Sequence, residues 1–105
     1  MSEPVLQGVR VLEIGGGISV AFAAKWLAGF GADVVRLDPV EEALTADEQV
    51  YLLAGKRRVS PAADPRALAL AADIVVEGDS PGDVVKHLRR IQPEALRARK
   101  PGLVV

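Results

Sequence analysis

The stretch from Val9 to Pro39 constrains the fold of this chain more than any other part of the sequence. An alternating apolar run ends in the glycines at positions 15, 16 and 17, an apolar segment with helical spacing follows, and Gly31 ends it. A second run rich in β-branched residues, Val34 to Leu37, then ends on Asp38. This order predicts the strand, turn, helix and strand that open a nucleotide-binding type of α/β domain. Glycines at such a turn allow a tight connection and let a ligand approach the backbone N–H groups of the helix N-terminus.

The remainder of the chain continues this alternation. Thr45 to Glu48 has the pattern of a capping box and predicts a short helix that ends near Leu53. Val59 predicts a minor strand. Asp64 followed by Pro65 predicts the N-cap and first turn of a helix that ends near Ala72.

Asp73 to Glu77 has the continuous apolar character of a parallel strand that is covered on both faces. We expect this strand to lie parallel to and beside the strand Val9–Ile14. Ser80 and Pro81 then predict the start of another helix, and Leu103 to Val105 resembles the start of a further strand.

These elements predict an α/β fold of three layers, a Rossmann-like open parallel sheet flanked by helices with the strand order 3-2-1-4-5. A chain of 105 residues makes one small domain, residues 1–105. Half of its residues are hydrophobic but only 4% are aromatic, which suits a parallel sheet covered by helices. Because the chain stops within an apolar run, we interpret it as a truncated part of a longer protein.

Composition excludes several classes of function. Thirteen basic and 14 acidic residues leave a net charge of −1, so no overall field attracts nucleic acid or an anionic membrane. The absence of cysteine excludes disulfides, thiolate catalysis and cysteine-zinc sites. No signal peptide and no apolar run of transmembrane length is visible. We therefore expect a cytoplasmic protein with no metal, nucleic-acid or membrane partner.

Three polar or aromatic features carry further expectations. The Ser19 hydroxyl is predicted to cap the first long helix. Trp26 lies on or beside the apolar stripe of that helix, which predicts packing in the core or at its rim. The basic run from Lys56 to Arg58, taken alone, is typical of a solvated helix end.

The glycines by themselves leave three interpretations open. Gly15 and Gly17 fit a dinucleotide fingerprint, but Val20 breaks its third position. Asp38 stands where an acidic residue binds a ribose hydroxyl. The same turn is similar to the first motif of class I S-adenosylmethionine methyltransferases, in which an acidic residue at this position also binds ribose. The third interpretation is an unspecific tight turn.

Other segments point to one family. The runs Leu6–Glu13 and Leu27–Pro39 resemble the amino-terminal part of family III CoA-transferases, which include formyl-CoA and carnitine CoA-transferases and α-methylacyl-CoA racemases. Gly55–Val59 is similar to the Lys-Arg-Ser-Val segment of this family. Ala72–Gly82 is similar to its Ala-Asp-Val-x-x-Glu-Asn-x-x-Pro-Gly turn, and Pro101–Val104 to its Asn-Pro-x-Leu-Val. The resemblance covers nearly all of the chain, in the right order.

The resemblance implies that coenzyme A, as CoA or acyl-CoA, binds through its nucleotide end. Three places contribute: the turn after the first strand, the Lys-Arg segment and the turn that contains Glu-Asn. The corresponding residues here are Ile18, Ser19, Leu53, Lys56, Arg57, Gly78, Asp79, Ser80 and Lys86. The cations among them suit the 3′-phosphate and pyrophosphate of CoA.

The chain departs from the family pattern in its turns. The family's Ala-Gly-Pro is replaced by Ser-Val-Ala at residues 19–21, and the polar residue before it is Ile18. Two glutamates, Glu41 and Glu42, replace the Gly-Asp expected after Pro39. Asn-Phe-Arg is replaced by Gly-Asp-Ser at residues 78–80. The chain therefore looks like a diverged copy of the domain.

The resemblance also implies the chemistry of the whole protein. Transferases of this family pass CoA between carboxylic acids through an aspartyl-CoA thioester, whereas the racemases move a proton α to the thioester. The nucleophilic aspartate lies beyond the matched segment, so we expect no catalytic residue here and no activity of the isolated chain. Expected partners are acyl-CoA, the remainder of the parent polypeptide and, in the full-length protein, a second subunit. The alternatives are a methyltransferase-like or other dinucleotide-binding domain and a non-catalytic structural domain.

Overall fold

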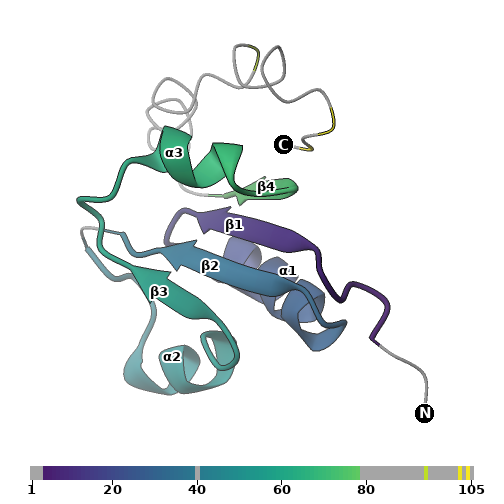
Figure 1. Cartoon of the computed structure of the whole chain (residues 1–105). Coiled ribbons are helices and arrows are strands. Elements are labelled where there is room, and N and C mark those ends of the chain that lie inside the picture. Colours follow the sequence, from purple (N-terminus) through teal and green to yellow (C-terminus); the bar gives the residue numbers. More distant parts are fainter. Residues whose placement is uncertain (1–3, 40, 79–93, 95–101, 103, 105) are drawn as a thin grey trace.

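The computed structural model describes residues 4–39, 41–78, 94, 102 and 104. Strands and helices alternate along the chain (Figure 1). The elements are β1 (Arg10–Ile14), α1 (Ile18–Gly29), β2 (Asp33–Leu37), α2 (Ala46–Leu52), β3 (Arg57–Val59), α3 (Pro65–Leu70) and β4 (Ile74–Glu77).

The strands form one sheet in the order β3-β2-β1-β4, and every neighbouring pair is parallel. The predicted α/β fold and the predicted pairing of the first strand with the strand near residue 75 are both confirmed. Val104 makes an isolated parallel bridge to Ile74, on the side of β4 where a fifth strand is predicted. The remainder of that predicted strand and the helix predicted after Ser80 lie outside the described residues.

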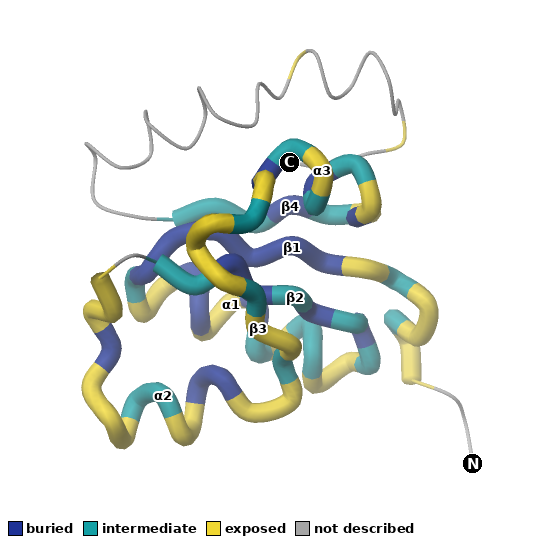
Figure 2. The backbone as a smooth tube through the Cα atoms, turned by 60° about the vertical axis from the view of Figure 1, so that its left-hand side comes forward, coloured by how far each residue is buried: buried dark blue, intermediate teal, exposed yellow. Residues whose placement is uncertain are grey.

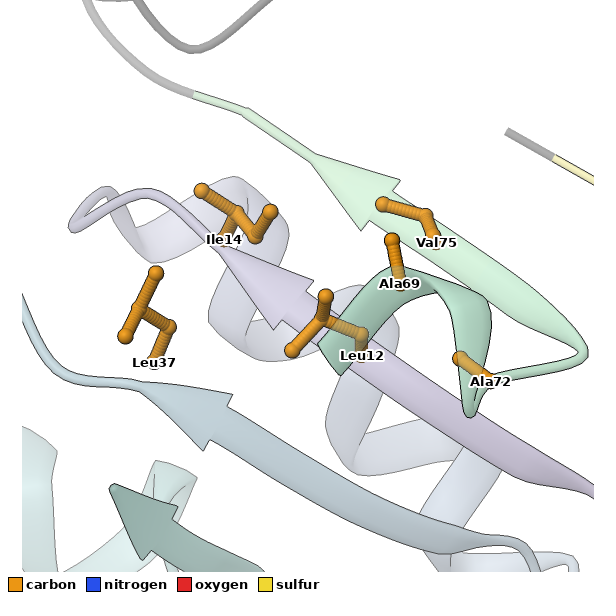
Figure 3. Close-up of a cluster of buried hydrophobic side chains, with 6 residues drawn as sticks. All are labelled: Leu12, Ile14, Leu37, Ala69, Ala72 and Val75. Atoms are coloured by element: carbon orange, nitrogen blue, oxygen red, sulfur yellow. The ribbon is translucent and has the colours of Figure 1, made fainter. Parts of the chain in front are cut away.

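Helices cover both faces of the sheet, which makes the three layers. On one face, Val11 and Val34 pack with Ala24 of α1. On the other face, Leu12 and Ile14 of β1 pack with Ala69 of α3 (Figure 3). β1 therefore supplies alternate side chains to two cores, as a central strand covered on both faces must. Figure 2 shows the dark-blue buried positions gathered in β1 between the helices.

Local signals place the starts of two helices correctly. The Thr45 hydroxyl accepts a hydrogen bond from the Glu48 backbone N–H at 3.2 Å, and the Glu48 carboxylate accepts one from the Thr45 N–H at 2.8 Å. This is the predicted capping box. Asp64 caps α3 by accepting from the Arg66 N–H at 3.0 Å, and Pro65 occupies the first helical position.

Two predictions about α1 are wrong. Ser19 does not cap the helix, because the N-cap of α1 is Gly17, two residues earlier, and no side chain caps it. Trp26 does not pack in the core, because 57% of its surface is exposed. The helix buries its small residues Val20, Ala21 and Ala24 instead. A face of small side chains lets the helix lie close to the sheet, so its large side chains point outward.

Candidate functional site

The carboxyl ends of the parallel strands meet at one edge of the sheet. Gly15 follows β1, Asp38 follows β2 and Gly78 follows β4. The chain leaves β1 through α1 on one face and reaches β4 through α3 on the other, so the strand order reverses between β1 and β4. In open α/β sheets, ligands bind in the crevice at this reversal. The candidate site therefore lies at the turn between β1 and α1.

Two glycines shape this turn. Gly15 has φ +114°, a conformation that side chains of L-residues rarely adopt. The Gly78 N–H donates to the Ile14 carbonyl at 3.2 Å, and a Cβ at Gly78 would lie 2.9 Å from the Cβ of Val20. Only glycine lets the end of β4 lie this close to the first turn of α1. Because α1 has no side-chain cap and no acidic residue in its first turn, its N-terminal N–H groups remain available to an anion.

An ionic cluster with a buried inner part lies beside this turn, between the sheet and the helices α1 and α2. It consists of Glu13, Arg36, Asp38, Glu42, Lys56 and Arg58. Its inner part is Glu13 on β1 and Arg36 on β2, which face each other in register and are both 0% exposed. The Glu13 carboxylate lies 2.6 Å from Nζ of Lys56 and 3.4 Å from Nε of Arg36.

The outer part of the cluster reaches the carboxyl edge. The Arg36 guanidinium donates to both oxygens of Glu42, at 2.8 and 3.0 Å, and to Asp38 at 2.9 Å. Arg58 donates to the same Asp38 carboxylate at 3.0 Å. The cluster contains equal numbers of acidic and basic groups, so its charges balance internally.

Burial and pairing shift the pKa values in this cluster. Burial raises the pKa of Glu13, although Lys56 and Arg36 oppose this. Burial also lowers the pKa of Lys56, against the attraction of Glu13. At the edge, the hydrogen bonds from Arg36 lower the pKa of Glu42. Loss of solvent therefore dominates at Glu13 and Lys56, whereas pairing dominates at Glu42 and at Arg36, whose pKa its acidic partners raise against the effect of burial.

Lys56 links the cluster to the glycine turn. Its ammonium donates to the Ala21 carbonyl of α1 at 2.8 Å, and its side chain is 0% exposed. The first turns of α1 are thus tied through Lys56 and Glu13 to the central strand of the sheet. This connection fixes the position of the helix N-terminus at the crevice.

The residues predicted to bind CoA fall in three groups. Ile18 and Ser19 are exposed at the start of α1, and Gly78 lies beside them against Val20. These three share the carboxyl edge. Asp79, Ser80 and Lys86 lie outside the described residues.

The residues of the Lys-Arg segment lie away from that exposed edge. Leu53 is 7% exposed in a core with Ala21, and Lys56 lies inside the ionic cluster. Arg57 pairs with Asp33, the first residue of β2, and is therefore directed toward the amino edge of the sheet. Lys56 is accordingly not the solvated residue that the basic run alone indicates.

The pairing of Glu13 with Arg36 was not predicted from the sequence. The signal was one charged residue inside each of two central strands, Arg10–Ile14 and Asp33–Leu37, in which only the first residue is otherwise charged. Each stands one residue before the last residue of its strand, so parallel pairing in register places the two side chains on the same face. Asp38, considered for a ribose hydroxyl, is engaged by Arg36 and Arg58.

Among the described residues, no three His, Cys, Asp or Glu side chains converge as metal ligands would. None of the helices placed in this part of the chain has the length and apolar character needed to cross a membrane.

One family of known sequences matches part of the chain. Residues 6–50 match the model of CoA-transferase family III. This part of the chain is therefore similar to CoA-transferase family III. The match runs from before β1 through the glycine turn, α1 and β2 into α2, and it confirms the resemblance seen in the motifs. No curated protein matches the chain.

Several solved structures are similar to this chain. Rv3272 from Mycobacterium tuberculosis, in its orthorhombic form, is 30% identical with a TM-score of 0.68, over 95% of this chain and 30% of that one. A CAIB/BAIF family protein from Brucella suis is 22% identical with a TM-score of 0.65, over 92% of this chain and 31% of that one, which shows a shared fold. BdcA from E. coli shares the fold at 20% identity, with a TM-score of 0.51 over 94% of this chain and 61% of its own. The chain spans 30% of the length of Rv3272.

Proposed function

We propose that the chain is the CoA-binding amino-terminal part of a CoA-transferase family III protein, either a CoA-transferase or an acyl-CoA racemase. The match to the family over residues 6–50 carries this proposal, because those residues build the strand, turn and helix at the crevice. The uncapped N-terminus of α1 suits the phosphates of CoA.

Each exposed residue at this edge has a role in the proposal. The backbone N–H groups of Ile18 and Ser19 receive a phosphate, and the exposed Ile18 side chain offers apolar surface to the adenine ring. Gly78 allows the ligand to approach β4. Asp79 and Ser80 continue this turn in the sequence, and Lys86 supplies a cation for the phosphates.

Leu53, Lys56 and Arg57 act less directly in this proposal. Leu53 packs beneath the site. The Lys56 ammonium is held by Glu13 and the Ala21 carbonyl, so Lys56 supports binding by positioning α1. Arg57 contacts a phosphate only after exchanging its present partner, Asp33.

We further propose that the isolated chain has no transferase activity. Asp38 at the carboxyl edge is a poor nucleophile, because two arginines engage its carboxylate. Mass spectrometry of the chain after incubation with acyl-CoA donors and acceptor acids is expected to find no CoA thioester. An adduct on Asp38, or measurable transfer, would show that the chain itself carries the chemistry.

Titration calorimetry with CoA, NAD and S-adenosylmethionine tests the binding proposal. CoA is expected to bind most tightly. Tighter binding of S-adenosylmethionine would favour a methyltransferase-like site, tighter binding of NAD a dinucleotide site, and no binding of any of the three a structural domain.

Two matched variants test where CoA binds. Ser19→Glu places a carboxylate in the exposed first turn of α1 and is expected to weaken CoA binding by about tenfold, because it repels the phosphate. The control is Ala67→Glu, which adds the same charge to the exposed first turn of α3 on the other face of the sheet. Both substitutions favour their helix dipoles, so both variants are expected to fold. Equal weakening by the two variants would contradict the site.

A further inference from the structure

The most exposed charge of the ionic cluster is a cation. The Arg58 side chain is 47% exposed, whereas the side chains of Asp38 and Glu42 are each 23% exposed. The basic partners of these acids lie deeper, because the side chains of Arg36 and Lys56 are fully buried. An anion in solvent therefore has better access to the Arg58 guanidinium than to any other charge of the cluster.

One N–H group of Arg58 is anchored, and its other N–H groups are free. Its Nε donates to both oxygens of the Asp38 carboxylate, at 3.0 and 3.1 Å. Asp38 is itself held by Arg36 at 2.9 Å. An arginine has five N–H donors, and the two terminal nitrogens of Arg58 donate to none of the residues that the structure describes. Four donors therefore lie on a guanidinium whose position is held by Asp38.

Arg58 lies on the face of the sheet that α1 covers. It is in register with Arg36 on β2, and Arg36 shares its face with Val34, which packs against α1. The Asp38 N–H donates to the Val59 carbonyl at 3.0 Å, so the ends of β2 and β3 adjoin at the carboxyl edge. β1 and β3 lie two strand spacings apart, roughly 10 Å. The Arg58 side chain shortens this distance by reaching back to Asp38.

We propose that Arg58 binds the 3′-phosphate on the ribose of CoA and makes the site prefer CoA to nucleotides that lack this phosphate, a proposal that rests on the CoA-binding function proposed above. The pyrophosphate and the 3′-phosphate of CoA are attached to the same ribose. A pyrophosphate at the N-terminus of α1 therefore leaves the 3′-phosphate one sugar away, within the span from β1 to Arg58.

The pairing of Arg58 with Asp38 favours a ribose that carries a phosphate. In dinucleotide-binding sheets, an acidic residue near the end of the second strand binds a ribose hydroxyl, whereas a nearby arginine accommodates a phosphate at that position. Here the acidic residue is Asp38, and Arg58 already engages both of its carboxylate oxygens. The free N–H groups of Arg58 suit the oxygens of a phosphate monoester, because a guanidinium can donate two parallel hydrogen bonds to them.

Arg58 is the residue of the basic run that has free donors at the carboxyl edge. The family's Lys-Arg-Ser-Val segment has serine at this position, so the resemblance implies no role for Arg58. The two cations to which it does assign phosphate contacts are engaged elsewhere. Lys56 is buried against Glu13, and Arg57 pairs with Asp33 toward the amino edge.

Calorimetric titration of the chain with CoA and with 3′-dephospho-CoA measures what this phosphate contributes. The parent chain is expected to bind CoA about tenfold more tightly than dephospho-CoA, as one charge-assisted contact would produce. Arg58→Gln is expected to weaken CoA binding by about tenfold and to change dephospho-CoA binding by less than about twofold. The control is Arg10→Gln, which removes the same charge from the exposed first residue of β1 at the amino edge and should keep the preference for CoA.

A second variant guards against a loss of folding. Arg58→Lys keeps a cation beside Asp38 but removes the planar set of donors, so an intermediate preference of about threefold is expected. A parent chain that binds neither ligand would contradict the proposed CoA site and Arg58 binding together, and so would tighter binding of NADP than of CoA. CoA binding without a preference over dephospho-CoA would overturn the role of Arg58 alone. A preference that persists unchanged in both Arg58 variants, or an equal loss in Arg10→Gln, would do the same.

Discussion

Replacing Lys56 by methionine tests the buried part of the ionic cluster most sharply. Methionine keeps the approximate length of the side chain and removes its charge. The Glu13 carboxylate then stays buried with Arg36 as its nearest cation, at 3.4 Å, and the Ala21 carbonyl loses its donor. Arg36 cannot replace Lys56 fully, because Glu42 and Asp38 already engage its guanidinium.

The expected cost is large for a domain of this size. Removing one partner of a buried pair typically costs about 3–5 kcal/mol, because the other charge is left uncompensated. The total stability of a 105-residue domain is about 5–15 kcal/mol. Lys56→Met is therefore expected to remove a large share of the free energy of unfolding near pH 7.5.

The cost should also depend on pH in a definite direction. The pKa of Glu13 is already raised by burial, and loss of Lys56 raises it further. A carboxyl group with a higher pKa in the folded state than in the unfolded state binds protons preferentially when folded, so acidification stabilises the fold. The destabilisation caused by Lys56→Met should therefore shrink from pH 7.5 to pH 5.

Urea unfolding of a double-mutant cycle measures this coupling. Glu13→Gln combined with Lys56→Met removes both charges, and the double variant is expected to be more stable than Lys56→Met alone by about 2–4 kcal/mol. The control is Lys25→Met, the same substitution at a contact near the surface, with an expected cost below about 1 kcal/mol. A Lys56→Met cost no larger than that of the control, or a cycle that is additive within about 0.5 kcal/mol, would refute the reasoning.

Three further predictions concern the edge of the cluster, the crevice and the start of α2. Arg36 lowers the pKa of Glu42, so the Glu42 carboxylate stabilises the fold above its unfolded pKa, and this stabilisation is lost as the pH falls through its folded pKa. Glu42→Gln should therefore reduce the loss of stability on acidification below about pH 5. Glu41→Gln, at an exposed neighbouring position, should not. Gly78→Ala should cost about 1–3 kcal/mol in urea unfolding, because its Cβ would meet Val20, and Val20→Ala should recover part of that loss; no recovery would contradict the contact. Thr45→Ala should cost about 0.5–2 kcal/mol by removing the cap of α2, and an unchanged unfolding midpoint would show that the cap contributes nothing.

Much of the fold was predictable because its signals are local. The apolar runs that became β1 and β4 are short and continuous, and the right-handed crossover rule then limits the strand order. Thr45 and Asp64 identified helix starts because a cap acts on residues two or three positions away. Trp26 was misplaced because the buried face of α1 is chosen by contact with the sheet, and small residues allow the closer approach.

The candidate site was less predictable because its charges pair across the fold. Nothing near Lys56 in the sequence indicates that its ammonium meets Glu13, since that contact forms only when α1, α2 and the sheet are assembled. Arg36 likewise is a charged residue inside an apolar strand, and its partner is identified only when β1 and β2 are paired in register. The glycine turn was predictable, because three adjacent glycines after a strand favour a tight turn with backbone conformations that other residues rarely adopt.

The central proposal is that the crevice at the glycine turn binds CoA. Its most direct test is a titration of the ¹⁵N-labelled chain with CoA, followed by nuclear magnetic resonance. We expect saturable shifts concentrated in the amides of Gly15 to Ser19 and of Gly78, and smaller shifts in helix α3. Saturable shifts centred on α3, or no shift at the glycine turn at CoA concentrations that saturate binding in calorimetry, would contradict it.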